Sequence, residues 1–207
     1  MKATFIRHGE STGNAGIASH DHELLELTNK GWQQARKLAA SWNEIPALIV
    51  TSPYLRAQQT AQPTIERFPG VPVEIWPIQE FTYLEPGRWN GTLKVERDPH
   101  IEAYWQAVQP DYQDGKGAES FANLLRRAET TLEKLQRLGS EGPVFLFTHG
   151  QFMQAVRHTV MFPEWTDKQK MEHFWPFAKH SPVLNGQKIE VELGSTGWQL
   201  TARCVTK

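Results

Sequence analysis

Two residues near the start of the sequence, Arg7 and His8, have the chemistry of a phosphate site. An imidazole can attack phosphorus as a nucleophile, and a guanidinium fork can hold phosphate oxygens. The pair directly follows a short apolar run, residues 3–6, and precedes Gly9. This pattern predicts a buried strand that ends in a polar loop, which is where open α/β sheets place their ligands.

A second apolar run, residues 47–51, is followed within a few residues by another cation, Arg56. It leads into Ser52, which is expected to be a helix N-cap, and Pro53, which suits the first helical position. Arg56 would then lie about one turn inside the helix, near its positive end. The sequence therefore predicts a second basic side chain at a strand end.

A third apolar run, residues 143–148, ends in His149 and Gly150 and so repeats the logic of the first. Each of the three runs is short enough to be a buried strand. Three strand ends therefore offer two histidines and two arginines to one site.

These segments, in this order, resemble the histidine phosphatase superfamily, also called phosphoglycerate-mutase-like proteins. The resemblance runs from Lys2 to about Val156. It rests on Arg7-His8-Gly9-Glu10, on Ser52-Pro53 with Arg56-Ala57 and Gln59-Thr60-Ala61, on Thr148-His149-Gly150, and on minor matches at Leu27-Thr28, Gly31, Gln34-Ala35 and residues 117–121. It implies a metal-independent phosphatase that hydrolyses phosphomonoesters through a phosphohistidine.

The resemblance also implies a role for each matched residue. Neutral His8 is expected to attack phosphorus in line. Arg7 and Arg56 are expected to clamp the equatorial oxygens, because phosphoryl transfer depends mostly on positioning and electrostatics. His149 is expected to donate a hydrogen bond to the transferring group, as a cation while phosphate is bound, and Asn14 to add a neutral donor. Water then hydrolyses the phosphohistidine.

The leaving alkoxide needs a proton, and a carboxylic acid can supply it. By resemblance to the family, the acid is expected to be Glu80. Many relatives have fewer residues between this glutamate and a Gly-x-Trp-x-Gly-like stretch, which here is residues 87–91. That spacing leaves Glu85 as an alternative acid.

The pattern of apolar residues predicts the elements that position this site. Helices are expected at residues 27–44 (capped by Thr28 or Asn29), 53–68, 120–138 (closed by Gly139), 152–160 and 171–177, and a further strand at 71–78. Alternating residues at 188–193 and 198–205 predict a C-terminal β-hairpin at the sheet edge. The fold expected is α/β, a three-layer sandwich with a mostly parallel central sheet flanked by helices. The length suits a single domain over residues 1–207.

Residues 80–119 are rich in Pro, Gly, Trp and Tyr. They are expected to form a small insertion that covers the strand ends and sets substrate selectivity. Trp89 and Trp105 are the two tryptophans expected to line a pocket there. By contrast, Glu10 is expected to support its own loop. Arg126 and Arg127 are expected on a solvated helix face, with a distal contact to an anionic substrate as the alternative.

Composition excludes several function classes. The formal net charge of −1 gives no global field for nucleic acid or an anionic membrane, and no run of 18 apolar residues predicts a membrane span. The one cysteine, Cys204, cannot form an intramolecular disulfide or a cysteine-based zinc site. The N-terminus lacks the apolar core of a signal peptide, so the cytoplasm is the expected compartment. His20-Asp21-His22 is expected to be a solvated loop, since no third metal ligand is evident. We expect no metal and no cofactor.

Three other functions remain open at this point. The first is a phosphoglycerate mutase that needs a bisphosphorylated cofactor. Such mutases are usually longer and carry an Arg-rich stretch after the acid, whereas residues 81–119 hold scattered basic residues such as Arg88 and Arg97. The second is a phosphatase of phosphoproteins or phosphohistidine, and the third is a catalytically silent phospho-ligand sensor. A phosphorylated small molecule is the expected partner, and no pattern indicates an oligomeric state.

Overall fold

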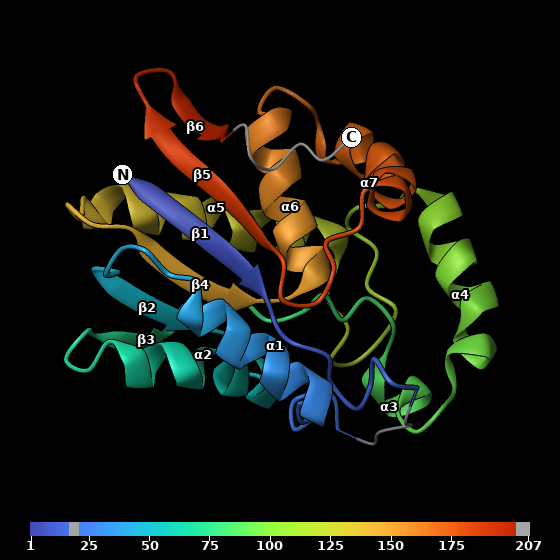
Figure 1. Cartoon of the computed structure of the whole chain (residues 1–207). Helices are drawn as coiled ribbons and strands as arrows, with labels where there is room; N and C mark the ends of the chain where they lie inside the picture. The colour runs from blue at the N-terminus through green and yellow to red at the C-terminus, as the bar shows by residue number, and fades with distance from the viewer. Residues whose placement is uncertain (17–20, 202–207) are drawn as a thin grey trace.

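A six-stranded sheet forms the centre of the computed structural model, which describes residues 1–16 and 21–201 (Figure 1). The strand order is β3-β2-β4-β1-β5-β6. The strands are β1 (Lys2–Arg7), β2 (Leu48–Thr51), β3 (Val73–Ile75), β4 (Val144–Thr148), β5 (Lys188–Gly194) and β6 (Gly197–Leu200). The first four pair in parallel, whereas β5 and β6 are antiparallel and close one edge as a hairpin. The mostly parallel sheet and the C-terminal hairpin are as the sequence predicts.

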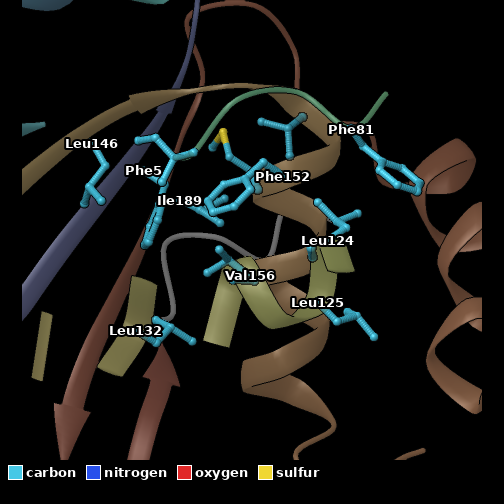
Figure 2. Close-up of a cluster of buried hydrophobic side chains, with 14 of the residues drawn as sticks. Phe5, Phe81, Leu124, Leu125, Leu132, Leu146, Phe152, Val156 and Ile189 are labelled. Carbon is cyan, nitrogen blue, oxygen red and sulfur yellow. The ribbon is translucent and has the colours of Figure 1, made fainter. Parts of the chain in front are cut away.

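Helices cover both faces of the sheet, which confirms the expected three layers (Figure 1). The helices are α1 (Asn29–Ala40), α2 (Leu55–Arg67), α3 (Pro86–Trp89), α4 (Lys94–Ala107), α5 (Phe121–Leu138), α6 (Gly150–Met161) and α7 (Asp167–His180). One core cluster joins α1 and α2 to Ile6 of β1 and Phe147 of β4. A larger cluster lies on the other face, where Phe5 and Leu146 pack with Phe152 of α6 (Figure 2). Adjacent residues of β1 therefore serve opposite layers, as strand geometry requires.

The register of the sheet brings the predicted functional segments together. Arg7 of β1 pairs with Thr148 of β4, and Thr51 of β2 pairs with Phe147 of β4. Three neighbouring parallel strands thus end at the same edge of the sheet. His8, Ser52 and His149 are the residues that come directly after those ends.

The helix ends follow the expected capping chemistry at two places. Thr28 caps α1 by accepting a hydrogen bond from the Gly31 amide at 3.1 Å. Ser120 caps α5, and Gly139 ends that helix in the left-handed region at φ 54°. The prediction for α2 is wrong, because the helix begins at Leu55 after a Tyr54 N-cap, so Ser52 is not its cap.

The insertion and the tail complete the architecture. Helices α3 and α4 lie beyond the end of β1 (Figure 1). Trp105 of α4 is buried and stacks on the rings of Phe174 and Trp175, so its predicted place in a pocket is wrong. Strand β6 ends at Leu200, and the predicted continuation to residue 205, with Cys204, falls partly outside the described residues. Among the helices described, none is long and apolar enough to span a membrane.

Candidate active site

His8 lies at the end of β1 with its ring held from both sides. Its side chain is 2% exposed, and its backbone amide donates to the Thr148 carbonyl at 2.9 Å. Arg56 Nε donates to His8 Nε2 at 3.2 Å. Since a guanidinium can only donate, Nε2 must hold the lone pair, and the ring proton must be on Nδ1, which lies 2.7 Å from the Gly9 carbonyl oxygen. The nitrogen with the lone pair is therefore next to the positive charge of Arg56.

The loop after His8 is fixed by its backbone. The Gly9 amide donates to Thr60 Oγ1 at 3.0 Å. A Cβ atom at Gly9 would lie 2.6 Å from the Gly31 carbonyl oxygen, so only glycine allows this loop to approach the start of α1. Glu10 accepts from Thr28 Oγ1 and forms an ion pair with Lys30, and it thus supports the loop as expected.

Both predicted arginines reach the same region. Arg56 is 5% exposed, and its Nη1 donates to the His22 carbonyl at 2.5 Å. Arg7 Nη1 donates to the Val183 carbonyl at 2.6 Å. Arg7 Nε is buried and finds no acceptor within residues 1–16 and 21–201. The arginines are anchored at one end by backbone carbonyls, which leaves donors for an anion.

His149 lies beside His8, with the two ring centroids 5.0 Å apart. It is fully buried, and its Nε2 lies 2.8 Å from Ser52 Oγ. Nδ1 has no hydrogen-bond partner among the described residues. Ser52, which is expected to be a helix cap, thus contacts a predicted site residue instead. Its position directly after β2, one strand from His149, is the signal that could have identified it.

Burial and the arginines shift the titration of both histidines. Desolvation lowers the pKa of His8 well below its usual 6.5, and the charges of Arg56 and Arg7 lower it further. Desolvation likewise lowers the pKa of His149 well below 6.5, with Arg56 and then His8 adding to the effect. Both rings are therefore expected to be neutral near pH 7. The cationic His149 expected in the complex requires the charge of a bound phosphate.

The carboxylate of Glu80 lies close to the histidines and arginines, beside the first turn of α6. Its Oε1 accepts hydrogen bonds from the Gln151 amide at 3.0 Å and from the Phe81 amide at 3.1 Å. Its charge also favours the protonated forms of Arg7 and Arg56, whose pKa values burial lowers. Glu80 therefore shares the electrostatic environment of the two arginines.

Glu85 lies in a different environment. It forms an ion pair with Arg88 at 2.8 Å and packs against the backbone of Gly115, where a Cβ would lie 2.6 Å from its Cδ. Glu80 lines the cavity next to Arg56, whereas Glu85 does not line it. The geometry thus favours Glu80 over Glu85 as a proton donor.

Asn14 is exposed, and its side-chain oxygen ties two loops together. Oδ1 accepts from Ser11 Oγ at 3.0 Å and from Asn185 Nδ2 at 3.1 Å. The same Asn185 nitrogen donates to the His8 carbonyl at 2.9 Å. The contacts of Asn14 are those of a loop residue next to the backbone of His8.

Arg127 has a structural role that its place on the polar face of a helix does not predict. Its Nε and Nη2 bind the two carboxylate oxygens of Glu119, each at 2.7 Å. Its Nη1 donates to the carbonyls of Pro77 at 2.9 Å and Gln79 at 3.1 Å. The expectation of a solvated helix face is wrong for Arg127, because this side chain fixes the segment that carries Glu80.

A cavity of about 210 Å³ adjoins Arg56 and Glu80. Aromatic side chains supply much of its wall, and Arg97 supplies a cation. Trp89 lines it as predicted. His22 also lines it, from a half-buried position in the predicted loop, while His20 is outside the described residues. The insertion, residues 80–119, therefore contributes much of the wall of the cavity beside Arg56.

A metal site would need several ligands close together. Within the described part of the chain, no group of three or more His, Cys, Asp or Glu side chains is placed to hold a metal ion. The charge that could balance a phosphate here comes from Arg7 and Arg56.

The chain is similar to proteins that are named as phosphatases. It is 27% identical over 173 residues to a mannitol-1-phosphatase of Eimeria tenella, which covers 66% of this chain and 55% of that protein. It is 29% identical over 164 residues to a glucosyl-3-phosphoglycerate phosphatase of Mycolicibacterium vanbaalenii, covering 75% and 72%. The matched part thus spans about half the length of the first of these relatives.

The fold is shared with solved structures. The alpha-ribazole phosphatase of Shigella flexneri superposes with a TM-score of 0.73 at 21% identity, and the match covers 97% of this chain and 95% of that one. The model of the histidine phosphatase superfamily, branch 1, matches residues 3–200. This range includes the three strand ends and the paired histidines that follow two of them. The chain belongs to the histidine phosphatase superfamily.

Proposed function

We propose that this chain is a metal-independent phosphatase that hydrolyses phosphomonoesters of small molecules through a phosphohistidine on His8. The observation that carries the proposal is the placement of a neutral imidazole with its lone pair beside Arg56 and 5.0 Å from the ring of His149. A nucleophile held among cations suits an anionic electrophile that would otherwise repel it. The curated relatives described above are named as phosphatases.

In the first step, His8 Nε2 forms a bond to phosphorus while the bond from phosphorus to the ester oxygen breaks. Arg7 and Arg56 hold the equatorial oxygens, and Arg56 must release Nε2 as it turns to the phosphate. His149 donates from its free ring nitrogen, with Ser52 holding the other. The ester oxygen takes a proton from Glu80 and leaves as an alcohol.

In the second step, Glu80 works in the opposite direction. Its carboxylate takes a proton from water, and the water oxygen attacks phosphorus. The bond between phosphorus and His8 Nε2 breaks, which returns the neutral ring and releases inorganic phosphate. The hydrogen bond from Nδ1 to the Gly9 carbonyl keeps the proton on Nδ1 in the free ring.

The cavity beside Glu80 supports a compact leaving group. Its volume of about 210 Å³ is below the common range for drug-sized ligands, roughly 300–1,000 Å³. Tyr54, Phe81 and Trp89 offer ring surfaces to a carbon skeleton, and Arg97 offers a cation. We propose a small phosphorylated metabolite as the partner, a single domain for the whole chain, and the cytoplasm as its compartment.

The test is a turnover screen over phosphorylated metabolites in excess chelator, with acid-labile labelling by substrate phosphate as the second measurement. The wild type should release phosphate and become labelled. His8→Ala should lose the label and at least about 10³-fold of the rate, because no nucleophile remains. His180→Ala removes an exposed histidine at the end of α7 and should change neither. Activity that chelator abolishes, or label that persists in His8→Ala, would refute the proposal.

A further inference from the structure

A second and larger cavity is distinct from the one beside Glu80. It has a volume of about 500 Å³ and lies between α1, α6 and the segment that leads into β5. Its lining shares no residue with that of the cavity beside Glu80, within the described chain. Its size lies within the usual range for a bound small molecule.

The charged residues that line this cavity are all basic. Lys37 comes from the last turn of α1, Arg157 from α6 and Lys188 from the start of β5. No Asp or Glu contributes to the lining, as far as the structure describes the chain. Glu190, outside the lining, is 3.6 Å from Lys188 Nζ. Three cations from three elements, two of them on flexible lysine stems, form a local positive field in a protein whose net charge is −1.

Arg157 gives this cavity a fixed donor. The residue is 7% exposed, and its guanidinium lies over the ring of Phe177 at 4.6 Å. Hydrogen bonds to Gln154 Oε1 at 3.2 Å and to the Ser181 carbonyl at 3.3 Å hold it in place. Leu38, Val183 and Ile189 add apolar surface to the lining. The site thus combines a positioned guanidinium with room for a carbon skeleton.

We propose that this cavity binds a small organic polyanion, such as a bisphosphorylated or polycarboxylated metabolite. The volume exceeds the need of a single phosphate ion, and the three cations match two or more anionic groups on one molecule. This binding site is additional to the catalytic function proposed above and does not depend on it.

The wall of the cavity is also the support of the catalytic loop. The Val183 carbonyl accepts from Arg7 Nη1 at 2.6 Å. Asn185 Nδ2 donates to the His8 carbonyl at 2.9 Å, and the Gly186 amide donates to the Arg7 carbonyl at 3.1 Å. A ligand that repositions residues 182–187 would therefore alter Arg7 and His8. Binding of a ligand in this cavity should therefore change kcat. The change in kcat depends on the proposed phosphatase function, whereas the binding itself does not.

The test uses methylenebisphosphonate, whose P–C–P linkage is not a phosphomonoester, as the probe. Isothermal titration calorimetry is run on the protein with its catalytic site saturated with orthovanadate. The probe should bind, and Lys37→Gln and Lys188→Gln should each weaken binding by about fivefold, the upper range for a partly exposed ion pair. Arg36→Gln is the matched control, because Arg36 is the exposed neighbour of Lys37 on α1 and does not line the cavity.

Two results would overturn the proposal. One is the absence of binding to the vanadate-saturated protein. The other is binding that Arg36→Gln weakens as much as Lys37→Gln does, which would indicate general attraction to a basic surface. Calorimetry reports binding whether or not the chain is a phosphatase, so this test can fail while the proposed function holds. Steady-state kinetics then measures the effect of the probe on kcat. This effect should be smaller in Lys37→Gln and Lys188→Gln than in the wild type.

Discussion

Arg127 provides a direct test of how the proposed acid is positioned. The substitution Arg127→Met keeps an apolar stem against Phe152, over whose ring the guanidinium lies at 5.1 Å. It removes both bonds to Glu119 and both bonds to the carbonyls of Pro77 and Gln79. The segment before Glu80 then loses its anchor on α5.

The structure sets the size of the effect on stability. The ion pair is partly exposed, at 15% for the Arg127 side chain and 19% for Glu119. Its loss should therefore cost about 2 kcal/mol, between the values for surface pairs and fully buried pairs. For a chain of this length, the melting temperature should fall by about 4–8 °C. Arg126→Met, at the exposed neighbouring position, should leave it nearly unchanged.

The effect on catalysis should depend on the leaving group. A displacement of Glu80 by about 1 Å can cost roughly 10²-fold when its proton is needed. An alkyl phosphate such as glycerol 2-phosphate needs that proton, whereas p-nitrophenyl phosphate releases a stable anion. We expect kcat/KM of Arg127→Met to fall by about 30-fold or more on the alkyl ester and by less than about threefold on the aryl ester. Measurements below the melting temperature that show equal losses on both esters would refute the positioning argument.

Three further predictions concern the acid, the second histidine and the response to pH. Glu80→Gln should reduce turnover of the alkyl ester far more than that of the aryl ester, while Glu85→Gln should leave turnover of both esters unchanged. If steady-state assays show the selective loss in Glu85→Gln and not in Glu80→Gln, Glu85 is the acid. Ser52→Ala removes the hydrogen bond of 2.8 Å between Ser52 Oγ and His149 Nε2 and should lower kcat by about 10-fold. Ser52→Thr keeps a hydroxyl group and should therefore retain activity. Burial lowers the pKa of His158 from 6.5 to about 4, so its contribution to stability is present above pH 6.5 and is lost as the pH falls toward 4. Urea titrations at pH 7 and 4.5 should show that the wild type loses about 2 kcal/mol more than His158→Gln, and equal losses would contradict the burial argument.

The strand ends explain why much of the fold and of the site could be predicted. Apolar runs followed by Arg7-His8 and His149 are local patterns, and parallel pairing necessarily brings their ends to one edge. The helix over residues 121–138 was equally clear, because its cap, its apolar face and its terminal glycine agree.

The missed features all depend on contacts between distant segments. Ser52 was assigned to a helix cap because local propensity favours that role, while its partner His149 is 97 residues away. Arg127 looks like a surface residue on its own helix until the carbonyls of Pro77 and Gln79 approach it. Trp105 lies in the insertion, yet it packs on α7, which a local pattern does not reveal.

The central position of β1 affects how the protein can be made. The strand that leads to His8 is synthesised well before its two neighbours, β4 and β5, where Ala3 pairs with Val144 and with Val191. A chain growing on the ribosome must keep this apolar strand unpaired until nearly all later elements have emerged, which slows folding and favours aggregation. A polypeptide interrupted directly after α7 would carry the nucleophile and the arginines and still lack the carbonyl of Val183 and the amide of Gly186 that hold Arg7. Catalytic competence is therefore gained only after the segment before β5 has emerged, and chaperones that shield unpaired apolar strands should increase the yield of folded protein.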